Sequence, residues 1–117
     1  MENKITDLNE ICNMAIKFWG YRASIVVPYL KQEKVVARLY DAFEFKFNFI
    51  NEHYEDLFHA SLLLPDNVAM DRILGFNAWK TPTKENIIKT FEVIDRYCRL
   101  RLPDKYLEAF DEAYANK

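Results

Sequence analysis

Hydrophobic positions near the N-terminus recur three and four residues apart, the spacing of one helical face. Asp7 can cap the start of such a helix, and Gly20 suits the left-handed position that follows a helix end. We therefore predict a helix from about residue 7 to about residue 19. Its apolar stripe consists of Ile5, Leu8, Ile11, Cys12, Ala15, Ile16 and Trp19.

The central segment, from Lys34 to Leu64, carries two competing patterns. Placed at about 100° per residue, nine apolar residues fall on one stripe, as in an amphipathic helix. Inside this segment, residues 43–49 alternate between phenylalanine and a polar residue, the period of a half-buried strand. The alternation explains only four positions and has no clear neighbouring strand, so we predict a helix. The helical stripe consists of Val36, Leu39, Tyr40, Phe43, Phe47, Ile50, Tyr54, Leu57 and Phe58.

An unbroken helix over this segment would be too long for a compact chain of this size. About 30 helical residues extend roughly 45 Å, whereas a domain of about 100 residues has a radius of gyration of about 13 Å. We expect the helix to bend or break near Asn48 to His53, because Asn and His lower helix propensity.

Two further segments are bounded by turn and capping residues. Residues 24–31 are compatible with two structures. One is a short helix capped by Ser24 with Pro28 in its first turn, and the other is a short extended segment. Later in the chain, Asp66 can cap a short helix that ends at Gly75, and a loop follows it.

The C-terminal third predicts two helices. Thr81 followed by Pro82 is a helix start signal. Pro103 interrupts the helix that follows, and a last amphipathic helix begins after it. Together these elements predict one all-α domain over residues 1–117, a bundle of five or six helices with a long central helix. The apolar stripes of the last two helices consist of Ile87, Phe91, Ile94 and Cys98, and of Leu107, Phe110 and Tyr114.

The amino-acid composition excludes several classes of function. Half of the 117 residues are hydrophobic and the formal net charge is -2, which suits one packed domain and excludes a generally basic nucleic-acid coat. The two glycines are isolated, so Gly-rich phosphate loops are excluded. The N-terminal sequence lacks a signal-peptide pattern, and no apolar stretch approaches the roughly 20 residues of a membrane span. We expect a cytoplasmic protein that does not enter a membrane.

Candidate catalytic and metal-binding groups are sparse. Cys12 and Cys98 fall on core stripes, which predicts buried structural thiols. On a helix, Glu52, Asp56 and His59 would share one face at metal-binding spacing, but the chain has no second pair like Asp56-x-x-His59. We therefore expect no cofactor, no metal and no enzyme activity, and a metal-dependent helical enzyme ranks third among our hypotheses.

The charge layout is asymmetric. Residues 41–71 hold seven acids and one base, so this segment has a net charge of -6 and the rest of the chain +4. On a helix, Phe45 and Phe49 would point away from the core stripe, although an exposed Phe forgoes about 1.5–3 kcal/mol. They either pack as a second core layer or form an aromatic anchor ringed by acids, as in a binding hot spot. The candidate partner-binding residues are Asp41, Glu44, Phe45, Phe49, Glu52 and Asp56.

These features favour a small non-catalytic binding protein that inhibits or sequesters a basic protein. The most concrete version is an immunity protein that neutralises a nuclease toxin, and a phage-encoded inhibitor of a nucleic-acid enzyme would look similar. A homodimer through Phe45 and Phe49 ranks lower, because an acidic surface repels its own copy.

The second hypothesis uses the basic C-terminal region. From Lys80 to Lys105, seven bases stand against four acids. Arg96, Arg99 and Arg101 would contact phosphates in a nucleic-acid-linked regulator, such as an antitoxin or a transcription accessory protein. No winged-helix, zinc or RNP motif accompanies these residues, so nucleic-acid binding ranks below a protein partner.

Overall fold

The computed structural model describes residues 4–52, 55–63 and 81–115. Within these residues, the chain forms three α-helices, two short 3-10 helices and one four-stranded antiparallel sheet. The elements in chain order are α1 (Leu8–Trp19), η1 (Gly20–Arg22), β1 (Ala23–Tyr29), η2 (Leu30–Gln32), β2 (Lys34–Leu39), β3 (Phe43–Glu52), β4 (Glu55–Leu63), α3 (Lys84–Arg101) and α4 (Asp104–Tyr114).

The predicted all-α bundle is wrong, because the central segment forms β2, β3 and β4 instead of a long helix. The alternation over residues 43–49 decides its structure: Phe45 and Phe47 are buried and Glu44 is exposed. Both pairing partners of β3 lie in the segment itself, since β2 pairs with its first half and β4 with its whole length. Three adjacent strands satisfy the backbone hydrogen bonds and bury the phenylalanines together, so the coincidental helical stripe does not form.

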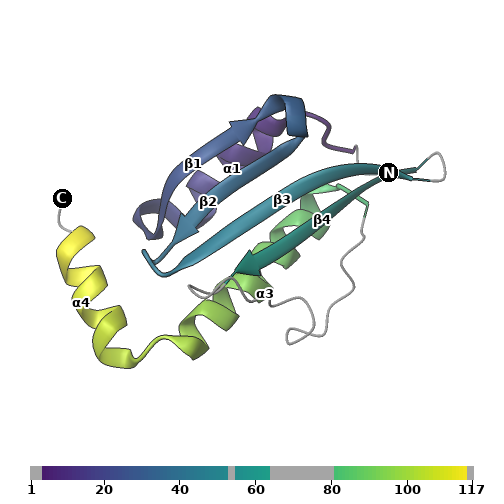
Figure 1. Ribbon diagram of the computed structural model, residues 1–117. Coiled ribbons are helices and arrows are strands. Elements are labelled where there is room, and N and C mark those ends of the chain that lie inside the picture. The colour runs from purple at the N-terminus through teal and green to yellow at the C-terminus, as the bar shows by residue number, and fades with distance from the viewer. Residues whose placement is uncertain (1–3, 53–54, 64–80, 116–117) are drawn as a thin grey trace.

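The sheet is a meander with the strand order β1-β2-β3-β4. Helices α1 and α3 cover one of its faces, and α4 lies beyond the sheet end that carries the β2–β3 turn (Figure 1). α1 and α3 run parallel and side by side. Their starts are tied by a bridge between Lys4 and Thr83, and Trp19 at the end of α1 bonds to Asp95 on α3.

The core lies between this helical layer and the covered face of the sheet. The helices contribute aliphatic and aromatic side chains such as Ile11, Trp19 and Phe91, which pack against every second residue of β2, β3 and β4. The buried sheet residues are Val35, Ala37, Leu39, Phe43, Phe45, Phe47, Phe58, Ala60 and Leu62.

The predicted start and end of α1 are confirmed, whereas the start predicted for α3 is two residues too early. Asp7 caps α1 by accepting a hydrogen bond from the Asn9 amide at 2.9 Å, and Gly20 follows the helix with a φ of 58°. The cap of α3 is Thr83 rather than Thr81, because the Thr83 side chain accepts from the Asn86 amide.

Residues 24–31 adopt the extended alternative, as β1 followed by the start of η2. The predicted helix between Asp66 and Gly75 and the loop after it lie outside the described residues. In the described part of the chain, no helix combines the length and the apolar character needed to cross a membrane.

Candidate functional site

Phe45 and Phe49 do not form an exposed anchor. Phe45 is 0% exposed, and its ring centroid lies 5.3 Å from that of Trp19 and 5.7 Å from that of Phe91. Phe49 is half-buried and packs edge-on against Phe47. Odd-numbered residues of β3 share one face, and the helices cover that face. Phe45 therefore belongs to the core and Phe49 packs at its margin, so the two rings do not form the exposed pair that the predicted hot spot and the homodimer required.

The predicted acidic residues are separated by the length of the sheet. Asp41 lies in the β2–β3 turn (residues 40–42) and Glu44 lies just after it. Glu52 and Asp56 belong to the opposite end of the β3–β4 hairpin, where Glu52 is paired with Glu55. At about 3.4 Å per strand residue, Glu44 and Glu52 are roughly 27 Å apart. The acidic segment is thus divided into two groups, Asp41 with Glu44 at one end of the sheet and Glu52 with Asp56 at the other.

The strand conformation also separates the residues on which the third-ranked hypothesis, a metal-dependent helical enzyme, depended. Asp56 and His59 lie three residues apart in β4, and residues three apart in a strand belong to opposite faces. Among the described residues, no group of three acids, histidines or cysteines is placed to hold a metal ion. Cys12 and Cys98 are both buried, as predicted, and burial raises the pKa of each thiol.

The three arginines of α3 do not form one phosphate-binding surface. Arg99 makes an ion pair with Asp95, with 3.2 Å between Nε and Oδ2, and it also donates to the Tyr40 hydroxyl. Arg96 and Arg101 are exposed. Arg99 is exposed as well, and it lines a hollow of about 430 Å³ on α3 together with Arg96, whereas Arg101 does not.

The opposite face of the sheet carries a hollow of about 580 Å³, which we call the sheet hollow. It extends from β1 across β2 and β3 to the last residue of β4, beside the β2–β3 turn. Its volume lies within the range of small-molecule and side-chain pockets. Its lining includes the side chains of Ile25, Tyr29, Val36, Arg38, Asp41, Glu44 and Leu63.

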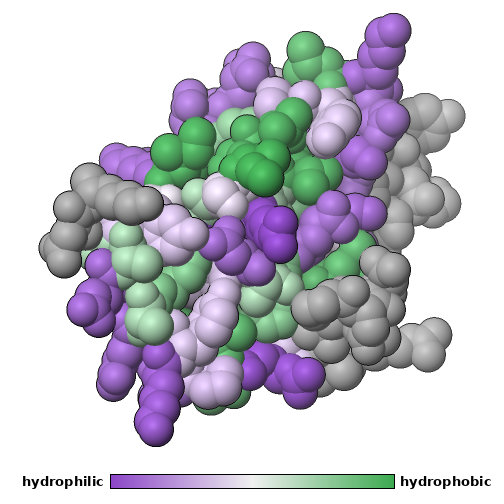
Figure 2. All heavy atoms as spheres, turned by 60° about the vertical axis from the view of Figure 1, so that its left-hand side comes forward, coloured by the Kyte–Doolittle hydropathy of each residue, from purple (hydrophilic) through white to green (hydrophobic). Residues whose placement is uncertain are grey.

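A bulge in β1 shapes one rim of the sheet hollow. The register between β1 and β2 shifts between Ser24 and Val27, and Ile25 has a φ of 53°. Bulges of this kind redirect a side chain, and Ile25 is 69% exposed. Tyr29 and Leu30 are also exposed at this edge of the sheet. Figure 2 shows hydrophobic residues gathered on the side of the molecule that lies to the left in Figure 1, with hydrophilic side chains around them.

The charges in the sheet hollow favour a cation. Arg38 lies opposite Glu44 across the β2–β3 pair, and its guanidinium donates to the Asp41 carbonyl at 3.3 Å. The Asp41 carboxylate accepts from the Tyr114 hydroxyl at 2.9 Å and from the Ser24 hydroxyl at 3.5 Å. No described residue is bonded to the Glu44 carboxylate. Two carboxylates against one guanidinium leave an unneutralised negative charge beside apolar walls.

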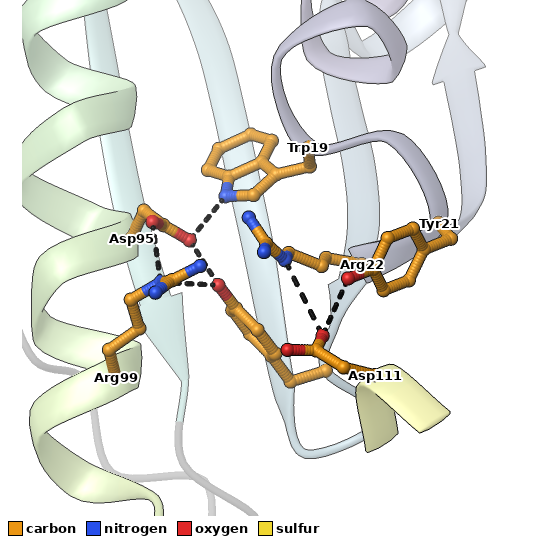
Figure 3. Close-up of polar contacts among 7 residues, drawn as sticks. Trp19, Tyr21, Arg22, Asp95, Arg99 and Asp111 are labelled. Carbon is orange, nitrogen blue, oxygen red and sulfur yellow. Dashed lines mark hydrogen bonds and ion pairs between the residues drawn. The ribbon is translucent and has the colours of Figure 1, made fainter. Parts of the chain in front are cut away.

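Behind the turn, Asp95 is the centre of a polar network (Figure 3). Its Oδ1 accepts from the Trp19 indole at 3.0 Å and from the Tyr40 hydroxyl at 2.6 Å, and its Oδ2 pairs with Arg99. Burial, together with the bond to Asp95, raises the pKa of Tyr40. The bonds to Trp19 and Tyr40 join α3 to α1 and to the β2–β3 turn, so this network holds the fold together.

The β2–β3 turn has an unusual backbone. Tyr40 and Asp41 have φ values of 55° and 53°, and the Ala42 amide donates to the Leu39 carbonyl, features of a type I′ turn. Such turns prefer Asn and Gly, and other residues pay about 1–2 kcal/mol each in the left-handed region. The Asp95 network and a hydrogen bond from Tyr106 to the Tyr40 carbonyl hold the turn in place. Strain at the rim of a hollow is typical of a functional position.

Sequence reasoning missed the sheet hollow but named two of its acids, Asp41 and Glu44. The lining residues that the sequence did not indicate, such as Ile25, Val36 and Leu63, lie in three different strands. The register between the strands brings them together, and the sequence alone did not show this register. The polar half of the alternation over residues 43–49 was the signal for this face, because it marks β3 residues that the helices do not cover.

Comparison with protein-family models, with curated proteins and with solved structures found no match.

Proposed function

We propose that the chain is a small non-catalytic binding protein that captures a basic protein through the sheet hollow. The observation that carries this proposal is the Glu44 carboxylate, which has no bonding partner among the described residues and lies beside apolar walls in a hollow on the sheet face opposite the helices. A Lys or Arg side chain fits such a site, because its alkyl stem packs on apolar groups while its charged end meets the carboxylate.

The partner segment is expected to combine a basic residue with an aliphatic or aromatic neighbour. Ile25 and Tyr29 are exposed on one rim, and Leu63 lies at the other side of the hollow. These groups can bury an apolar side chain while Asp41 and Glu44 contact the base. Apolar anchors next to a charge pair are the usual composition of a binding hot spot.

The charge of the whole acidic segment acts at longer range. Residues 41–71 have a net charge of -6, which attracts a cationic partner during encounter. In its most concrete form, the proposal describes an immunity-type inhibitor that occupies the phosphate-binding cleft of a nuclease toxin. Such binding weakens as salt screens the charges.

A displayed library of random peptides provides a test that needs no known partner. Peptides are selected on the wild-type protein at low salt, and their dissociation constants are measured against wild type, Glu44→Gln and a matched control, Glu92→Gln. Glu92 is an exposed acid on α3, outside the sheet hollow.

We expect selected peptides to contain Lys or Arg beside an apolar residue. Their affinity should fall about tenfold with Glu44→Gln, about 1.4 kcal/mol, and stay unchanged with Glu92→Gln. The proposal fails if selection yields no peptide whose affinity depends on Glu44, or if the dependent peptides are acidic or uncharged.

A further inference from the structure

Helix α4 is attached to the fold less firmly than α1 and α3. Phe110 is its only buried residue, whereas α1 and α3 bury five residues each. No side chain caps the start of α4. In Figure 1, α4 lies past the end of the sheet instead of on its face. Elements with few buried contacts open at a lower free energy than the whole domain.

The contacts that α4 makes converge on the β2–β3 turn. The Tyr106 hydroxyl donates to the Tyr40 carbonyl, and the Tyr114 hydroxyl donates to the Asp41 carboxylate. The Phe110 ring centroid lies 5.7 Å from that of Tyr40. α4 therefore contacts both turn residues that have left-handed φ values.

A second attachment leads back to the same turn. Asp111 accepts a hydrogen bond from the Tyr21 hydroxyl at 2.6 Å and lies 3.9 Å from Arg22 Nε (Figure 3). The carbonyl of Arg22 in turn accepts from the Tyr40 amide at 2.8 Å. The start of β1, the turn and α4 thus form one connected unit at the edge of the sheet hollow.

We infer that α4 is a detachable strap that switches the sheet hollow between two states. When α4 is docked, it holds Tyr40 and Asp41 in their left-handed conformation and fixes the Asp41 carboxylate at the rim. When α4 opens, the Tyr40 hydroxyl stays bonded to Asp95, but the Tyr40 carbonyl and the Asp41 carboxylate lose their bonds to α4, so the turn loosens and Asp41 is no longer fixed at the rim. The inference adds regulation to the proposed binding function, and a partner that binds the docked state must protect α4 by the same coupling free energy.

Hydrogen exchange of the ligand-free, full-length protein tests the strap directly. The amides of Tyr40 and Ala42 report on the turn, because both donate backbone hydrogen bonds there. We expect α4 amides to exchange at least tenfold faster than the core amides of α1 and α3. Exchange of α4 only at the rate of α1 and α3 would overturn the inference.

Variants of α4 test whether the turn follows the strap. Phe110→Ala removes the buried anchor, and the double variant Tyr106→Phe with Tyr114→Phe keeps every ring but removes both hydroxyls. Each should speed exchange of the Tyr40 and Ala42 amides at least tenfold with α1 and α3 unchanged. Glu108→Ala, at an exposed position of α4, is the matched control and should change neither. Turn amides that stay protected in the double variant would overturn the coupling.

The same hydrogen-exchange measurement can be repeated with a selected basic peptide bound to the protein. A peptide that binds through Glu44 should slow exchange of the α4 amides at least fivefold, and binding without this protection contradicts the switch. Failure to select any such peptide contradicts the proposed function alone, and the ligand-free exchange still decides whether α4 is a strap for the turn.

Discussion

The Tyr40 hydroxyl donates a hydrogen bond to Asp95, with 2.6 Å between the two oxygens. The two residues are 55 positions apart in the sequence, so this bond joins the β2–β3 turn to α3. Tyr40 is 1% exposed despite its place in a hairpin turn. The turn beside the sheet hollow is therefore supported from the helical layer, and the stability of this support can be measured.

Alkaline pH should weaken the fold through Tyr40. Its pKa is raised by burial and by Asp95, so above about pH 10 the phenol ionises in the unfolded chain but stays protonated in the folded one. Folding stability contributed by this group is thus complete below pH 10 and declines as pH rises. Urea unfolding between pH 8 and pH 11 should show a steeper loss for wild type than for Tyr40→Phe. Parallel pH profiles for the two proteins would refute this role.

Asp95→Ala should destabilise the protein by about 3 kcal/mol. The substitution leaves two buried donors, the Trp19 indole and the Tyr40 hydroxyl, without an acceptor, and each costs about 1–3 kcal/mol. Chemical denaturation followed by circular dichroism measures the loss. Asp95→Asn, which keeps an oxygen acceptor, should lose less, and exposed Glu92→Ala should stay within about 0.5 kcal/mol of wild type. Equal losses for Asp95→Ala and Glu92→Ala would mean that the network contributes no stability.

Alanine substitutions at neighbouring positions of β3 should differ in their effect on folding stability, because neighbouring side chains lie on opposite faces of the sheet. Phe45→Ala opens a cavity against Trp19 and Phe91 and should cost about 3–5 kcal/mol. Glu44→Ala, one position earlier on the uncovered face, should change stability by less than about 0.5 kcal/mol. Equal losses at both positions would be inconsistent with a strand covered on one face.

Both cysteine thiols should be unreactive in the folded protein. Cys12 and Cys98 are buried, and burial raises the pKa of each, so little thiolate is present at pH 8. The rate of reaction with a disulfide reagent should rise with urea in step with unfolding. Rapid modification of one thiol in native buffer would show that the structure around that cysteine opens locally without global unfolding.

The ends of the chain were more predictable than its centre. α1 and α3 follow from a stripe at helical spacing together with local capping groups, Asp7 and a threonine, which need no tertiary information. The central segment was ambiguous because Val36 and Leu39 fit a helical stripe, although they lie on opposite faces of β2. Only the alternation of Phe43 to Phe49 carried the strand period, and its pairing partners were hidden in the same segment.

The candidate site was predictable only in part. Asp41 and Glu44 stood out by charge. Phe45 was a candidate surface anchor on a helix, but in a strand it is buried in the core. The exposure of Ile25 depends on a bulge and a positive φ, which β-branched residues rarely adopt. A hollow built from four strands depends on register, which local sequence patterns do not specify.

An amide chemical-shift titration of the isotope-labelled protein with a selected basic peptide shows directly whether the partner binds in the sheet hollow. If the partner occupies the sheet hollow, the largest shifts should fall on Ile25, Val36, Arg38, Glu44 and Leu63, and they should disappear with Glu44→Gln. Shifts centred on the helical layer of α1 and α3, with the β-sheet amides unmoved, would show that the peptide binds elsewhere and that the sheet hollow is not the binding site.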